Sequence, residues 1–250
     1  MKDLFFYDAM CSVGCTRNGG RAPSTPAELF YEMDHYGIDK ALIQHANIAC
    51  AGAAFSNQWV ADFVAQDTSD RLRGVWCILP DQTCEVPLPL YDRMKENKIA
   101  ALTMHPADHR WIISKRSIGK VMGEAAERKI PMLLTSLENN FSEIYHLVDL
   151  FPDNIFIVHK TSRHSFDREL RPLLDQAENV YLSLSAYWVP EGIRDLAELY
   201  GADRILYGSA FPVFNHGSMM LPVKHSGLSE SDIAKIAGGN LERLLKEAWK

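Results

Sequence analysis

Short apolar runs alternate along this chain with longer segments in which apolar residues recur every three or four positions. Short runs bounded by glycine or proline are typical of buried strands, and the longer spacing is typical of helices that pack on one face. The first pattern predicts eight strands, over residues 5–12, 40–46, 74–79, 99–105, 131–136, 155–159, 180–185 and 204–208. Helical or loop sequence follows each of them.

The helical segments carry boundary signals of their own. Thr25 as N-cap, Pro26 at the first helical position and Glu28 closing a capping box predict a helix start. Ser56 is expected to cap the next helix. After the last strand, two closing helices are expected over residues 229–237 and 240–248, separated by two glycines.

This alternation predicts one domain over residues 1–250. Eight strands that each lead into a helix are the signature of a parallel (β/α)8 TIM barrel, and about 250 residues is a usual length for one. No linker, low-complexity run or internal repeat of about 20–50 residues interrupts the pattern. We therefore expect a single-domain α/β barrel that its C-terminal helices close.

Composition and charge narrow the range of partners. A formal net charge of −6 without a basic stripe argues against a general affinity for nucleic acid or an anionic membrane. No apolar run approaches the ~20 residues that span a bilayer, and the first residues lack the apolar region of a signal peptide. Five cysteines, an odd count without C-x-x-C spacing, favour free thiols in a reducing compartment. We expect a cytoplasmic protein whose partner is a small molecule; a homo-oligomer stays open.

Five motifs occur at fixed places in the strand pattern. They are F-F-Y-D-A-M-C-S-V-G at the first strand, M-H-P after the fourth, V-H after the sixth, G-S-A-F-P after the eighth, and G-G-N-L-E-R-L-L near the end. In this order, over nearly the whole chain, they resemble the amidohydrolase-related TIM barrels (amidohydrolase family 2). The resemblance implies hydrolysis of a C–N or C–O bond, or decarboxylation, of a small anionic or carbonyl-bearing molecule at the C-terminal mouth of the barrel.

The resemblance also implies a metal site, most of whose ligands this sequence lacks. The family's first strand ends in His-x-His, where this chain has Met10 and Ser12. The family's strand-five histidine falls near Thr135 or Ser136, and its strand-eight aspartate, which ligates metal and handles the proton of the attacking water, is replaced by Ala210. Thioether, hydroxyl and methyl groups are poor zinc ligands, so we expect no metal or other cofactor. An improvised zinc site would have to draw on Asp8, His45, His105 and His159.

His159 is the one usual family position that this chain retains, at the end of strand six. An imidazole with a pKa near neutrality suits proton transfer, and the alternative is a structural histidine. Asp8 is the second catalytic candidate. It shares the sequence parity of Met10 and Ser12, so we expect it to point into the barrel, whereas Cys11 has the opposite parity and should face the helices.

Polar residues after the other strands are candidates for substrate binding. Arg110 is able to hold a carboxylate with two hydrogen bonds, and Tyr187 is able to form an aromatic wall. The predicted substrate-binding set is His45, His105, Arg110, Glu138, Ser185 and Tyr187. Each has a structural alternative as an exposed loop residue or a packing residue. The alternative function for the whole chain is a catalytically silent barrel that binds a small molecule or a partner.

Overall fold

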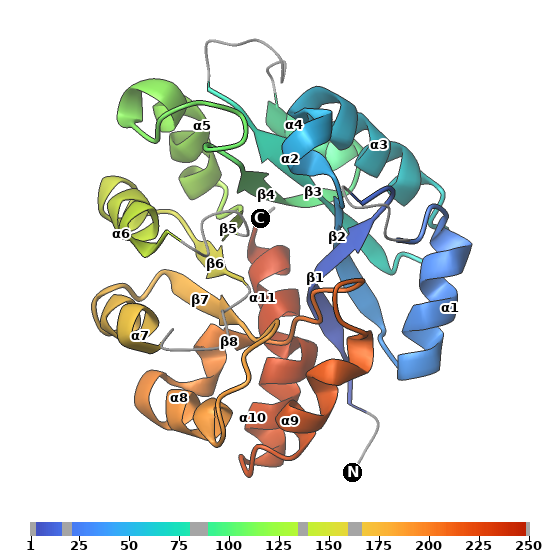
Figure 1. Ribbon diagram of the computed structural model, residues 1–250, viewed down its shortest axis with the longest axis vertical. Coiled ribbons are helices and arrows are strands. Elements are labelled where there is room, and N and C mark those ends of the chain that lie inside the picture. The colour runs from blue at the N-terminus through green and yellow to red at the C-terminus, as the bar shows by residue number, and fades with distance from the viewer. Residues whose placement is uncertain (1–3, 17–21, 81–89, 135–139, 160–166, 249–250) are drawn as a thin grey trace.

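The computed structural model describes residues 4–16, 22–80, 90–134, 140–159 and 167–248. Within these residues eight parallel strands follow one another around a barrel in chain order, which confirms the predicted (β/α)8 TIM barrel (Figure 1). Backbone bonds from Ala9 N to Tyr207 O (3.0 Å) and from Ser12 N to Phe211 O (2.8 Å) join the first strand to the last. The strands are β1 (Tyr7–Val13), β2 (Lys40–His45), β3 (Leu72–Ile78), β4 (Ile99–Met104), β5 (Met132–Leu134), β6 (Phe156–Val158), β7 (Val180–Ser183) and β8 (Ile205–Leu206).

The helices surround this sheet, and their starts follow the capping signals only in part. At the first helix the Thr25 hydroxyl accepts the backbone N–H of Glu28 (3.3 Å) and Pro26 takes the first position, as predicted. The second long helix begins at Ala53, so Ser56 lies inside it and is not its cap. The described helices are α1 (Pro26–Tyr36), α2 (Ile48–Ala51), α3 (Ala53–Ala65), α4 (Leu90–Glu96), α5 (Lys115–Glu127), α6 (Phe141–Leu150), α7 (Asp167–Gln176), α8 (Gly192–Tyr200), α9 (Met220–Lys224), α10 (Glu230–Ala234) and α11 (Asn240–Glu247).

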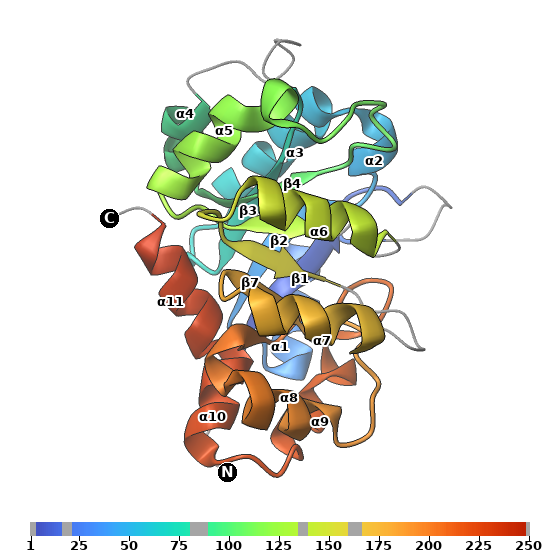
Figure 2. The same cartoon turned by 90° about the vertical axis from the view of Figure 1, so that its left-hand side faces the viewer.

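The sheet has an inner and an outer face, and each carries its own apolar cluster. The inner cluster fills the barrel and takes three leucines from α11, so this helix closes the N-terminal end. In Figure 2 α11 lies to one side of the strands, apart from α5 to α8. The outer cluster lies between the strands and the surrounding helices. The inner cluster consists of Tyr7, Ala9, Leu42, Val75, Ala100, Ala101, Leu133, Ile157, Leu206, Leu241, Leu244 and Leu245.

The two closing helices are joined, not separated, at their glycines. A π-helical turn over Lys235–Gly239 connects α10 to α11. A Cβ atom on Gly238 would lie 2.7 Å from both the ring and the carbonyl oxygen of Phe5, so only glycine lets the turn pack against the start of the chain. Gly238, one of the two glycines expected to separate the helices, therefore serves close packing against Phe5.

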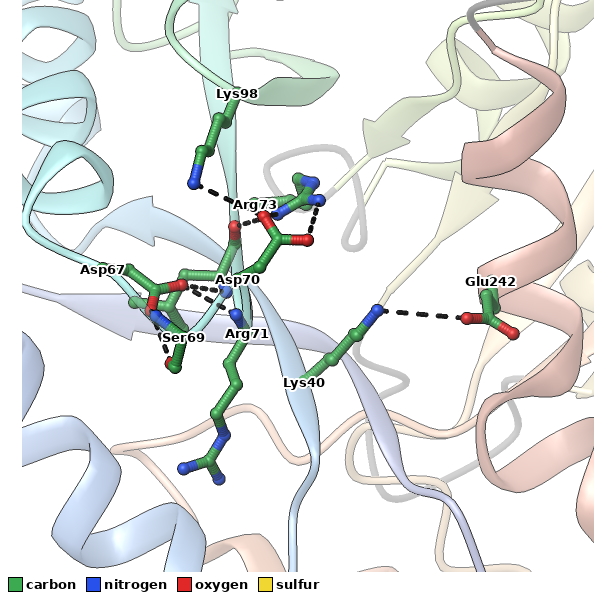
Figure 3. A network of polar contacts seen from close by, with 9 residues as sticks. Lys40, Asp67, Ser69, Asp70, Arg71, Arg73, Lys98 and Glu242 are labelled. Atoms are coloured by element: carbon green, nitrogen blue, oxygen red, sulfur yellow. Dashed lines mark hydrogen bonds and ion pairs between the residues drawn. The ribbon is translucent and has the colours of Figure 1, made fainter.

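Charged side chains at the N-terminal end of the barrel are paired with one another (Figure 3). Asp67, in the turn before β3, accepts the backbone N–H groups of Ser69, Arg71 and Leu72 (2.8 Å each) and the Ser69 hydroxyl (2.6 Å). Burial alone would raise the Asp67 pKa, but these hydrogen bonds outweigh it and lower the pKa. The other pairs are Asp70 with Arg73 (2.9 Å), Asp70 with Lys98 (3.4 Å), and Lys40 with Glu242 of α11 (3.9 Å).

Two further expectations concern cysteines and membranes. Cys11 is fully buried in the outer cluster, which confirms that it faces the helices, and burial raises the pKa of its thiol. The four cysteines in the described part of the chain, Cys11, Cys15, Cys50 and Cys77, are free. None of the described helices combines the length and the apolar character needed to cross a membrane.

Candidate functional site

The carboxyl ends of the strands meet at one opening, which is where barrel enzymes assemble their sites. Side chains alternate between the two faces of a strand, so residues two or four positions after a member of the inner cluster point into the barrel. Tyr181 of β7 packs against that cluster and fixes the parity of its strand. In the described ranges, the polar inner-face residues at these ends include Gln44, His105, His159, Ser183 and Ser185.

Asp8 does not belong to this set, because β1 carries a bulge. Asp8 lies opposite Ala41 of β2, whereas Cys11 lies opposite Ile43, so three steps on one strand match two on the other. One extra residue exchanges the two faces of a strand. Asp8 therefore lies on the outer face with Cys11, while Ser12 returns to the inner face. The expectation that Asp8 points into the barrel, which rested on uninterrupted alternation, is wrong.

The carboxylate of Asp8 instead fastens the segment after β8 to β1. It accepts the backbone N–H groups of Met10 (3.0 Å) and Ser209 (2.9 Å) and the Ser209 hydroxyl, and it contacts Nδ1 of His216 (3.0 Å). The His216 ring stacks on Phe211 at 4.3 Å and 10°. Both Asp8 and His216 are fully buried. This arrangement positions the loop after β8 and leaves Asp8 away from the inner face of the mouth.

His45 also lies on the outer face, as the last residue of β2. Its Nδ1 is 3.2 Å from the hydroxyl of Ser56, and its ring packs 5.0 Å from Trp59 of the same helix, α3. Burial in this contact lowers the pKa of His45. His45, which was predicted to bind substrate, is thus held between β2 and α3. It lies two residues after Ile43 of the outer cluster, so it points to the same outer face.

His105 follows β4 on the inner face and is almost fully buried. Its Nδ1 lies 3.6 Å from Oδ2 of Asp108, and its ring centroid lies 5.8 Å from that of His109. Neither ring nitrogen makes a hydrogen bond within the described residues. Burial, followed by the nearby His109, lowers the pKa of His105 to about 4 although Asp108 acts in the opposite direction. The imidazole is therefore uncharged at neutral pH.

His159 follows β6 on the inner face and has no exposed surface. Both of its ring nitrogens lack a hydrogen-bond partner in the described part of the chain. Burial lowers the pKa of His159 to about 3, so this imidazole also stays neutral at physiological pH. Buried polar atoms normally have partners, so two orphaned nitrogens on one ring indicate a place that a ligand or water occupies.

Ser185 lies beside Ser183 at the end of β7, and their hydroxyl oxygens are 2.9 Å apart. Both side chains are fully buried. Gly208, just after β8, faces this pair, because a Cβ atom there would lie 2.2 Å from the Ser183 hydroxyl oxygen. The missing side chain at Gly208 leaves room for both hydroxyls on this side of the mouth.

The remaining predicted residues lie at the rim or beyond the described ranges. Arg110 is exposed in the turn after β4, at a left-handed backbone conformation with φ of 57°. Tyr187 is buried and donates its hydroxyl to Oδ1 of Asp167 (3.1 Å), so it braces α7. Its ring also lines a cavity of about 280 Å³ with Trp188, between the loop after β7 and α9. Glu138 lies outside the described residues.

The family resemblance implies metal ligands at positions that carry few donors in this chain. Ala210 has no donor atom, Met10 offers only a thioether, and the Ser12 hydroxyl accepts a hydrogen bond from Gln44 Nε2 (3.4 Å). The four residues considered for an improvised site are divided, since Asp8 and His45 lie on the outer face while His105 and His159 lie on the inner face. Within the described ranges, no three His, Cys, Asp or Glu side chains are gathered as a metal site. Thr135 and Ser136 lie outside those ranges.

Sequence reasoning missed two residues of this region. Gln44 is the one strongly polar residue inside the apolar run 41–44, and its parity with Leu42 was a usable sign that it points inward. His216 carried no such sign, because its partner Asp8 lies 208 residues away along the chain. Only the three-dimensional closure of β8 against β1 brings that pair together.

Comparisons with known proteins agree with this architecture. A family model described as amidohydrolase matches residues 18–246 of the chain. No curated protein matches it. An uncharacterised TIM-barrel protein from Bordetella bronchiseptica is 19% identical, with a TM-score of 0.73 over 98% of this chain and 99% of that one.

Two further solved structures have assigned chemistries. A 2,6-dihydroxybenzoate decarboxylase from Rhizobium is 15% identical, with a TM-score of 0.71 over 97% of this chain and 99% of that one. A probable 2-pyrone-4,6-dicarboxylic acid hydrolase from Acinetobacter baumannii is 13% identical, with a TM-score of 0.69 over 96% and 99%. At such identities the likeness establishes the fold alone.

Proposed function

The chain belongs to the amidohydrolase family, and from this premise we propose that it hydrolyses a C–N or C–O bond of a small carbonyl-bearing molecule at the C-terminal mouth of its barrel. A side chain, not the family's usual metal, activates the water. His159 is the catalytic residue of this proposal. Solved barrels of similar fold include a protein described as a probable hydrolase and a decarboxylase.

The observation that carries the proposal is the state of the His159 ring. It lies on the inner face at the end of β6, and both nitrogens lack a partner within the described residues. An uncharged imidazole with a free lone pair is able to accept a proton, which is the task of a general base. The other ring nitrogen then remains available to orient the ring or the substrate.

The role of His159 as general base determines how protons move during hydrolysis. Water adds to the carbonyl carbon while His159 takes one of its protons and the carbonyl oxygen takes the negative charge. When the carbonyl re-forms, the C–N or C–O bond breaks and the proton passes to the leaving nitrogen or oxygen. A pKa of about 3 makes His159 a weak base in the empty site, and the negative charge that develops beside it favours its protonation.

Hydrolysis fits this site better than decarboxylation does. Loss of carbon dioxide leaves a carbanion, which an acid must protonate. A histidine whose pKa is lowered to about 3 carries no such proton at neutral pH. Decarboxylation would therefore need a proton donor other than His159.

A catalytically silent barrel that binds a small molecule is the second candidate. The observation that favours it is the loss of three family ligand positions, at Met10, Ser12 and Ala210. Such a protein would keep the mouth and its polar inner face and would bind ligands without turnover.

Turnover, chelation and elemental analysis on one preparation test the proposal. We expect hydrolysis of at least one member of a panel of small esters, lactones and amides, no stoichiometric transition metal, and no loss of rate with a chelator. Ala210→Asp adds one carboxylate but not the strand-one pair, so it should not create metal-stimulated hydrolysis. One zinc or iron per chain with chelator-sensitive turnover would contradict the proposal, and binding without turnover would support the silent alternative.

A further inference from the structure

A cavity of about 280 Å³ lies between the loop that follows β7 and the helices α8 and α9. None of the polar inner-face residues named for the mouth lines it, so this cavity is separate from the site described above. Pockets for small ligands usually span ~300–1,000 Å³. A volume just below that range suits a small molecule and excludes a folded partner.

Aromatic and proline rings form the walls of this cavity. Tyr187 is buried, Trp188 is 46% exposed, and Pro190 and Pro222 complete the apolar lining. The Trp188 ring meets the ring of Phe214 edge-on, with centroids 6.2 Å apart, so one side of the indole is already supported. Burying the rest of this indole against a flat apolar group is favourable, because aromatic side chains contribute large contact areas.

One guanidinium supplies positive charge beside these rings. Arg194 of α8 lines the cavity, and its Nε donates to the backbone oxygen of Ser226 (3.1 Å), just after α9. A Cβ atom on Gly227 would lie 2.0 Å from Arg194 Nη2, so the missing side chain leaves room for the guanidinium. Glycine also suits the left-handed φ of 76° at this position. The turn after α9 is therefore shaped to hold Arg194 at the cavity.

The guanidinium already has a carboxylate partner, which a ligand is able to replace. Arg194 Nη1 lies 3.0 Å from Oε2 of Glu191, and the two side chains are 43% and 73% exposed. Exposed ion pairs contribute little to stability, because solvent screens them. The Glu191 side chain makes no capping hydrogen bond to α8, so its departure from Arg194 does not uncap the helix.

We propose that this cavity is a second ligand site, which binds a small monocarboxylate with a flat apolar body. The ligand carboxylate displaces Glu191 and takes the paired hydrogen bonds that a guanidinium offers to a carboxylate. The apolar body lies against Trp188 and the two proline rings. No bond is made or broken there, so the proposal stands or falls independently of hydrolysis at the mouth.

Isothermal titration calorimetry of the full chain at pH 7 tests the site with three probes. Phenylacetate carries both features, phenylacetamide is its uncharged analogue, and acetate lacks the apolar body. We expect phenylacetate to bind once per chain and each of the other two to bind at least about ten-fold more weakly. Equal affinities for phenylacetate and phenylacetamide, or no binding of phenylacetate at millimolar concentration, would overturn the proposal.

Two substitutions in the ion pair should act in opposite directions. Arg194→Gln keeps hydrogen-bond donors but removes the charge, and it should weaken phenylacetate binding about ten-fold. Glu191→Gln removes the competing carboxylate and should tighten binding about two- to five-fold. Arg168→Gln, at an exposed position of α7, is the matched control and should change nothing. An affinity that Glu191→Gln does not raise, or that Arg194→Gln does not lower, would overturn the proposal.

A further pair of variants separates this site from the mouth. Trp188→Leu removes most of the flat wall without touching the charge, so it should weaken phenylacetate more than acetate. His159→Gln should leave phenylacetate binding unchanged. Melting temperatures of all variants show that they are folded. Binding that His159→Gln abolishes and Trp188→Leu preserves would place the ligand in the mouth and overturn the proposal.

Discussion

At the N-terminal end of the barrel Asp67 accepts four hydrogen bonds, and Asp70 bonds both Arg73 and Lys98 (Figure 3). At the carboxyl end the rings of His105 and His159 make no hydrogen bond among the described residues. Both ends are built from the same eight strands, so the sheet itself does not impose the difference. Loop and side-chain chemistry imposes it.

The contrast separates two uses of buried polarity. A carboxylate that is surrounded by backbone donors stabilises the turn that it closes, because those donors would otherwise be unpaired. A buried imidazole without partners destabilises the empty protein, and its cost is offset only when a ligand arrives. The hydrogen bonds at the N-terminal end thus contribute to stability, whereas the proposed function assigns the unpaired rings at the mouth to binding.

The largest expected effect tests the mouth. His159→Gln keeps most of the side-chain volume but cannot take up a proton near neutrality. General base catalysis commonly contributes 10²–10⁴-fold, so the activation barrier should rise by about 3–5 kcal/mol while the melting temperature changes little. Both properties are measured on one preparation. Unchanged turnover would reject the catalytic role, and a large fall in melting temperature would favour a structural one.

The next effect tests the opposite end. Asp67→Ala removes the acceptor for three backbone N–H groups and should lower the free energy of unfolding by about 3 kcal/mol, with no change in ligand binding at the mouth. Asp67→Asn keeps one acceptor oxygen and should lose less. Chemical denaturation measures the loss, and a stability within 0.5 kcal/mol of the parent would show that the turn does not depend on this carboxylate.

Per pH unit, a smaller effect appears as a pH dependence of the free energy of unfolding. The pKa of His159 is about 3 in the folded chain against 6.5 for a free histidine, so the unfolded chain binds one more proton between these values. The free energy of unfolding is therefore unaffected by His159 protonation above pH 6.5. Below that pH it falls by about 1.4 kcal/mol per pH unit. Denaturation from pH 4 to 7 should show a shallower slope in His159→Gln. The same slope in variant and parent would contradict the lowered pKa; His146→Gln, exposed on α6, is the control.

The smallest effect concerns a pair that looks prominent in Figure 3. Lys40 Nζ lies 3.9 Å from Glu242 Oε1, and both side chains are about one-third exposed. Such pairs contribute about 0–1 kcal/mol, so Lys40→Met should change the free energy of unfolding by less than about 0.5 kcal/mol. A loss of 2 kcal/mol would show that this contact holds α11 against the barrel more firmly than its geometry indicates.

The sequence was sufficient to predict the barrel because each strand and helix is marked by a pattern in its own residues. The apolar runs, the Thr25 cap and the C-terminal motif all depend on neighbours within a few positions. The inward direction of His105 and His159 was likewise predictable, because β4 and β6 reach their ends without a change of face. Local periodicity was therefore enough to predict the fold and the inward direction of these two histidines.

The rest depended on features that local pattern does not encode. The bulge in β1 turned Asp8 outward, and no residue between Asp8 and Cys11 marks it in the sequence. His45 was assigned to the mouth because it follows a strand, but the contact with Ser56 holds it against α3. Contacts between distant segments decided these residues, as they did for His216.

The bulge in β1 has a consequence for how this chain tolerates changes in length. Deleting one residue between Asp8 and Cys11 would make two steps match two and restore simple alternation, with Asp8 still on the outer face and Tyr7 still in the inner cluster. A deletion between Cys11 and Val13 would instead exchange the two faces of the strand on one side of the change. We expect a one-residue deletion at the bulge to be tolerated better than one elsewhere in β1.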